Sequence, residues 1–206
     1  MADTYLGGGA STRLWRIAAS ALLLLLPWSV AHAASNGPWS ATVYFGPSTT
    51  KFFTAVFSSG RLQATGAMLG VAGDGRLLYL GQGISLAGEA EITQYVFGHR
   101  NTTFSVGLGF QINAPFGLDH NRISIYDGPS YALDPPYTSI GYHNRVYPAS
   151  RNKFENYVVL EYAVALSSDS NWDVVGRLFH RSGAWGLYTD SDDDGLAFGL
   201  GLKYRF

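Results

Sequence analysis

Hydrophobic and polar residues alternate strictly over the last part of the chain. From Leu196 to Phe206, every even-numbered residue is leucine or an aromatic residue, and every odd-numbered residue is glycine, alanine, lysine or arginine. Successive side chains of a strand point to opposite faces, so this segment is predicted to be a strand with one apolar face. A strand with an apolar outer face, a polar inner face and an aromatic end is typical of a transmembrane β-barrel.

The same alternation predicts seven strands before this one, most clearly over 103–113. The turn signal Gly73–Gly75 leaves the end of the second strand open. The strand either ends at this signal or continues through Leu80 with a bulge. We favour a strand that runs past the signal, over 65–79. The predicted ranges are 39–46, 65–79, 84–96, 103–113, 121–130, 157–166, 173–182 and 196–206. Bacterial barrels have an even number of strands, so the sequence predicts an all-β fold, an eight-stranded antiparallel transmembrane β-barrel.

The inner faces of the predicted strands carry charged residues of both signs. A barrel of eight strands is filled by its own side chains, and buried charges are tolerated when they are paired. We therefore expect ion pairs inside the barrel. The residues expected to form them are Glu89, Glu91, Glu161, Asp173, Arg122, Arg177, Arg181, Lys203 and Arg205.

Connection lengths predict the orientation of the barrel. Long connections at 47–64, 131–154 and 184–193 follow the first, fifth and seventh strands. Short turns of bacterial barrels lie in the periplasm and long loops lie outside. The end of the seventh strand is therefore expected in the outer leaflet of the outer membrane.

The first residues of the chain read as a signal peptide. Two arginines precede a short apolar core at 17–30, and Ala31–Ala33 is a small-x-small cleavage site. The apolar core is too short for a spanning helix of about 20 residues. We therefore predict a signal peptide at 1–33 and an outer-membrane barrel domain at 34–206.

Composition narrows the classes of function. The chain has no cysteine, which excludes disulfides and lipoprotein acylation, and its formal net charge of −1 gives no indication of nucleic-acid binding. Residues Asp190–Gly195 match the first half of a calcium loop, but Gly201 stands where the later glutamate is expected, which argues against calcium. No metal and no cofactor are expected.

His180 and Ser182 interrupt the apolar face of the seventh strand. Alternation from Val174 points both outward, where a histidine and a serine have no packing reason to be. A serine becomes a nucleophile beside a base, and the base needs an acid to hold its tautomer. Asp194 has the same outward parity on the next strand and could meet His180 across the ladder, with Asp192 as the alternative acid. The competing interpretation is a polar rim that touches lipid head groups.

The segment 180–187, His-Arg-Ser-Gly-Ala-Trp-Gly-Leu, is followed by a glycine-rich strand that ends Lys-Tyr-Arg-Phe. It resembles the C-terminal region of the PagL-type lipid A 3-O-deacylases and their acyloxyacyl hydrolase-like relatives. The resemblance implies an eight-stranded outer-membrane barrel with His180 as base and Ser182 as nucleophile. The family's asparagine after the serine is Gly183 here, whose backbone N–H is the candidate oxyanion donor. Where the family has glutamate, this chain offers Asp194 or Asp192.

The positions of His180 and Ser182 predict a serine esterase, and the resemblance implies a hydrolase of the bacterial outer membrane that removes a fatty-acyl chain from lipid A of lipopolysaccharide. The alternative is a non-catalytic small outer-membrane barrel with a structural or adhesive role, for which the long loops at 47–64 and 131–154 would be the working surface. The sequence leaves open which acyl chain is removed and whether the protein forms a homodimer.

Overall fold

The computed structural model describes residues 38–49, 66–97, 101–134, 153–182 and 195–206. These residues form eight strands and one short 3-10 helix within a compact unit, Gly37–Arg205. In chain order the elements are β1 (Trp39–Thr49), β2 (Gly66–Gly81), β3 (Ile84–Phe97), β4 (Asn101–Asn113), η1 (Pro115–Gly117), β5 (Asn121–Ala132), β6 (Phe154–Ala165), β7 (Trp172–Ser182) and β8 (Gly195–Arg205).

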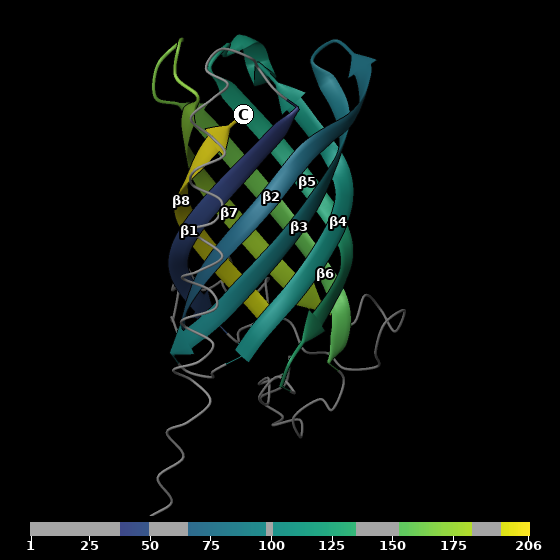
Figure 1. Ribbon diagram of the computed structural model, residues 1–206, viewed down its shortest axis with the longest axis vertical. Coiled ribbons are helices and arrows are strands. Elements are labelled where there is room, and N and C mark those ends of the chain that lie inside the picture. Colours follow the sequence, from purple (N-terminus) through teal and green to yellow (C-terminus); the bar gives the residue numbers. More distant parts are fainter. Residues whose placement is uncertain (1–37, 50–65, 98–100, 135–152, 183–194) are drawn as a thin grey trace, which may run out of the picture. The chain divides into compact units, whose positions relative to one another are not determined.

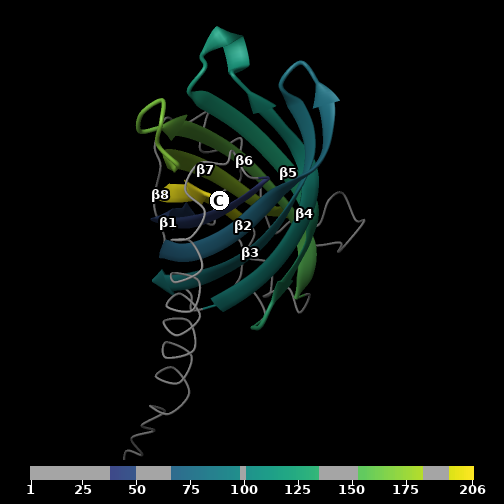
Figure 2. The ribbon, with the colours of Figure 1, turned by 45° about the horizontal axis from the view of Figure 1, so that its top comes forward.

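The eight strands close into one antiparallel barrel in chain order, and they run obliquely around it (Figure 1). Each strand pairs with the next, and β8 returns to pair with β1, where Val43 lies opposite Leu202. Figure 2 shows the same closed wall with one end turned toward the viewer. The predicted fold and number of strands are confirmed.

Strand boundaries differ from the sequence predictions at the end of the barrel that carries the long connections. β1 continues to Thr49, although the sequence predicts a loop from Pro47. β5 runs to Ala132, and β6 begins at Phe154 rather than at Tyr157. Pairing with neighbouring strands extends all three, and this pairing outweighs local turn residues.

β2 passes through the turn signal at Gly73–Gly75 and reaches Gly81. All three residues of the signal are paired with both β1 and β3, which keeps them extended. The register with β3 shifts after Arg76, so the strand continues past the turn signal with a bulge, as one of the two alternatives predicts. The favoured range 65–79 ends two residues too early. The turn itself lies at Gly81–Gly83, where all three residues have positive φ.

Alternation decides which side chains line the interior. In β4, Phe104, Val106 and Leu108 are exposed on the outer wall, whereas Thr103 and Ser105 are buried inside. The same period of two separates buried from exposed side chains in β1 and β6. The outer wall of these strands is therefore largely apolar, as the sequence predicts.

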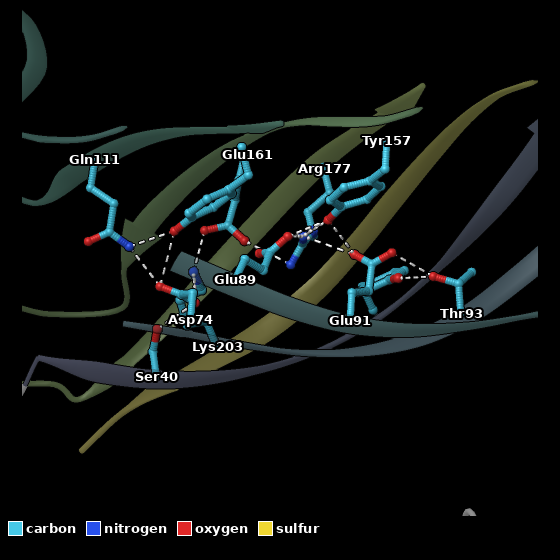
Figure 3. A network of polar contacts seen from close by, with 12 residues as sticks. Ser40, Asp74, Glu89, Glu91, Thr93, Gln111, Tyr157, Glu161, Arg177 and Lys203 are labelled. Carbon is cyan, nitrogen blue, oxygen red and sulfur yellow. Dashed lines mark hydrogen bonds and ion pairs between the residues drawn. The ribbon is translucent and has the colours of Figure 1, made fainter. Parts of the chain in front are cut away.

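Arg177 of β7 is the centre of a charged network that fills the interior (Figure 3). Its guanidinium contacts Glu89 Oε1 at 2.6 Å and Glu91 Oε2 at 3.0 Å, both from β3. It also contacts Glu161 Oε2 of β6 at 3.2 Å, and the Tyr157 hydroxyl donates hydrogen bonds to both glutamates of β3. Three strands are thus tied together through one buried cation.

Further ion pairs complete the interior. Lys203 of β8 contacts Glu161 and Asp74, with 2.8 Å between Lys203 Nζ and Asp74 Oδ1. Other pairs among the described residues, with their N–O distances, are Arg205–Asp173 (3.1 Å), Arg122–Asp173 (3.7 Å) and Arg181–Glu155 (3.2 Å). The predicted internal pairing is confirmed, and Asp74 and Glu155 join it although the sequence places them in a turn signal and next to a loop.

Candidate active site

His180 and Ser182 lie on the outer wall of the barrel at the end of β7. Both are partly exposed, whereas Arg181 between them is buried in the interior. Residues two apart on one face of a strand have Cβ atoms about 7 Å apart, which brings an imidazole and a hydroxyl within reach of each other. The structure therefore confirms that His180 and Ser182 share one outward face, and their roles as base and nucleophile stay predictions.

Interior ion pairs hold β7 in this register. Arg181 Nη2 contacts Glu155 Oε2 of β6 at 3.2 Å, and Arg177 is held by three carboxylates. Because successive side chains alternate between faces, two arginines anchored inward keep His180 and Ser182 outward. A slip of one residue would turn both arginines toward the outer surface, so interior charge fixes the orientation of the outer pair.

The β8 side of the pair is apolar where the structure describes it. Leu196 lies opposite His180 in the ladder and is buried. Asp192 and Asp194, the predicted acids, and Gly183, the predicted oxyanion donor, lie outside the described residues. Of the predicted site residues, the structure describes His180 and Ser182, and the catalytic roles of all five stay predictions.

On the β6 side lie two further polar residues, Asn156 and Asp127. Asn156 is opposite Ser182, and its Nδ2 donates a hydrogen bond of 2.9 Å to Asp127 Oδ1 of β5. Asp127 follows Ile125 on the outer face of β5, so its break in the apolar pattern is visible in the sequence. Asn156 precedes the predicted start of its strand and gives no such signal.

Together, Asp127, Asn156, His180 and Ser182 form what we term the outer polar cluster. Val158 lies opposite His180 on one side and opposite Asp127 on the other, within one row across three strands. Leu108 of β4 faces Asp127 from the far side and is exposed. The cluster thus borders an apolar wall that a lipid chain can contact.

Within the described residues, no group of three or more histidine, cysteine, aspartate or glutamate residues could hold a metal ion. Over the same part of the chain, no helix is long and apolar enough to cross a membrane. The chemistry that the candidate site offers is acyl transfer, in which a serine hydroxyl attacks a carbonyl with a histidine as base.

Comparisons with known proteins define the fold. No protein-family model matches the sequence, and no curated protein matches it. The outer membrane enzyme PagL is similar in structure, with a TM-score of 0.55 at 14% identity over 81% of this chain and 99% of that chain. Ail of Yersinia pestis, solved in a phospholipid bilayer nanodisc, has a TM-score of 0.45 at 12% identity over 81% and 99%. Neisserial surface protein A has a TM-score of 0.43 at 11% identity over 85% and 100%. The similarity to PagL shows that this chain has the fold of an outer-membrane barrel, a closed antiparallel barrel of eight strands.

Proposed function

We propose that this protein is a serine esterase of the bacterial outer membrane that removes a fatty-acyl chain from lipid A of lipopolysaccharide. The observation that carries the proposal is the position of His180 and Ser182, which share the outer wall of the barrel at one end. A nucleophile on this wall faces the membrane rather than the filled interior. The ester of a membrane lipid lies beside such a wall, so a lipid is the substrate that this position suits.

The wall itself supports a membrane location. Large apolar side chains such as Phe45, Phe110 and Leu200 are exposed on it, and the closed barrel leaves no unpaired strand edge. Both properties are required of a sheet that crosses a hydrocarbon layer. The predicted signal peptide at 1–33 supplies a route of export, and the long connections favour placing Ser182 in the outer leaflet, where lipopolysaccharide resides.

The proposed reaction uses His180 and Ser182. His180 takes the hydroxyl proton of Ser182 as the serine oxygen bonds to the acyl carbonyl carbon, and the carbonyl electron pair moves onto its oxygen. Collapse of this intermediate breaks the ester C–O bond, and His180 gives the proton to the departing alkoxide oxygen of the lipid, which leaves as a hydroxyl. Water then attacks the acyl-enzyme in the same way, which releases the fatty acid and restores Ser182. Asp194 or Asp192 would orient the imidazole, and the Gly183 N–H would contact the oxyanion.

Mass spectrometry of lipid A from cells that express the protein tests this function. Wild-type protein should yield lipid A lighter by one acyl chain than lipid A from cells with an empty vector. Ser167→Ala, at an exposed serine between β6 and β7, is the matched control for Ser182→Ala and should behave as wild type. Unchanged lipid A in cells whose barrel is folded in the outer membrane would favour the structural or adhesive alternative.

A further inference from the structure

Asn156 and Asp127 extend the outer polar cluster onto β6 and β5, and no step of the proposed reaction uses them. Asn156 lies directly opposite Ser182 in the β6–β7 ladder, and both are partly exposed on the outer face. Facing residues of an antiparallel pair have Cβ atoms about 4.5–5.5 Å apart. The Cβ atom of Asn156 is therefore nearer to that of Ser182 than the Cβ atom of His180 is, because His180 lies two residues away along the same strand.

The contact with Asp127 determines how the Asn156 amide is turned. A carboxylate oxygen accepts hydrogen bonds, so Nδ2 rather than Oδ1 of Asn156 must face Asp127, at 2.9 Å. Hydrogen bonds to a carboxylate are stronger than those between neutral groups, which favours one orientation of the amide. A side-chain amide nitrogen carries two N–H groups, and Asp127 Oδ1 accepts from one. The second N–H can be donated to another acceptor beside Ser182.

Asp127 occupies a costly position for a carboxylate. Its ladder neighbours are Leu108 on β4 and Val158 on β6, and it is exposed on the outer wall rather than joined to the interior network. A charged group on a lipid-facing wall destabilises a barrel, and such a residue by default indicates function. Holding an amide donor next to a nucleophile is a function that this geometry provides.

We propose that Asn156 is a further catalytic residue, whose amide donates a hydrogen bond to the carbonyl oxygen of the acyl ester as that oxygen becomes negatively charged. Asp127 is a positioning residue that holds the amide. This inference rests on the proposed esterase function and deepens it. Donors already aimed at the developing charge stabilise the transition state without reorganisation, and this contribution is usually the largest in acyl transfer.

Steady-state release of fatty acid from purified lipopolysaccharide by the purified mature barrel in detergent tests the role of Asn156. Asn156→Ala should lower kcat by about 10²–10³-fold with little change in KM, as loss of one oxyanion donor does. Asn156→Gln keeps an amide and should recover part of the lost rate. Asp127→Asn should lower kcat less than Asn156→Ala does. Leu160→Ala, on the same outer face of β6, is the matched control and should leave kcat unchanged.

A second measurement tests the role of Asn156 without any lipid substrate. A fluorophosphonate probe forms a bond between Ser182 Oγ and phosphorus with loss of fluoride, and the phosphoryl oxygen gains charge during the attack. The rate of this labelling should also fall in Asn156→Ala. Variants are compared only when unheated samples migrate as folded barrels on gels.

The outcomes are distinguishable. Folded Asn156→Ala with wild-type kcat and a wild-type labelling rate would overturn the role of Asn156 and leave the esterase intact. A wild-type protein that releases no fatty acid, but is labelled at Ser182 at a rate that depends on Asn156, would overturn lipid A as substrate and retain Asn156. A wild-type protein with neither activity would overturn both.

Discussion

Arg177 is the interior residue whose loss should destabilise the barrel most clearly. Its side chain is fully buried and contacts Glu89, Glu91 and Glu161 at 2.6–3.2 Å. Arg177→Met keeps an apolar chain in place but removes this cation from all three glutamates, of which Glu161 keeps its contact with Lys203. Removing one partner of a buried ion pair typically costs about 3–5 kcal/mol. We expect the free energy of unfolding to fall by an amount in this range.

Urea unfolding of the purified barrel in lipid vesicles, followed by tryptophan fluorescence, measures this loss. A change of about 4 kcal/mol lowers the folding equilibrium constant by about a thousandfold. This change is well above the error of extrapolating the free energy of unfolding to zero urea. Arg76→Met is the matched control, because Arg76 is exposed on β2 and surface substitutions usually change stability by less than about 0.5 kcal/mol. Adding Glu89→Gln to Arg177→Met should recover part of the loss. Equal stability of Arg177→Met and Arg76→Met would refute the reasoning.

Three further predictions concern the wall, the packing and the location. Leu200 is 74% exposed at the middle of β8, so Leu200→Arg should lower the free energy of unfolding in vesicles by about 2–4 kcal/mol, whereas Leu200→Ile should leave it unchanged. Equal stability of the two variants would mean that this face does not contact lipid. A Cβ at Gly70 would lie 2.0 Å from the Tyr44 ring, and Gly70→Ala should cost about 1–3 kcal/mol in the same urea assay. Gly176→Ala, which would meet only a Leu200 methyl at 4.0 Å, should be tolerated, and a similar loss at both glycines would refute the packing argument. The exported protein should fractionate with the outer membrane and migrate faster on gels unheated than boiled, and recovery as a soluble periplasmic protein would contradict the proposed location.

The wall of the barrel could be predicted from the sequence because its cause is local. Side chains alternate along any strand, so the apolar run from Leu196 to Phe206 and the inward arginines of β7 assign faces without knowledge of neighbouring strands. His180 and Ser182 follow from the same rule, since continuing the alternation by a few residues places them outward. The faces of the strands, and with them the outward position of His180 and Ser182, were therefore predictable.

Which residues of neighbouring strands face each other was not predictable in this way, because register depends on partners far away in the sequence. Asn156 comes to lie opposite Ser182 through the β6–β7 register, to which the buried Arg181–Glu155 ion pair contributes. No residue near Asn156 in the sequence indicates this. Gly73–Gly75 shows the converse, because a local turn signal is overridden by pairing with both neighbouring strands.

The central claim is that Ser182 is the nucleophile of a lipid A esterase. The most direct measurement compares fatty-acid release from purified lipopolysaccharide by purified wild-type protein and by Ser182→Ala. The variant should fold, because removal of one hydroxyl at a partly exposed position costs little packing, and its rate should fall by about a thousandfold or more. Release of acyl chains at the wild-type rate by folded Ser182→Ala would contradict the claim.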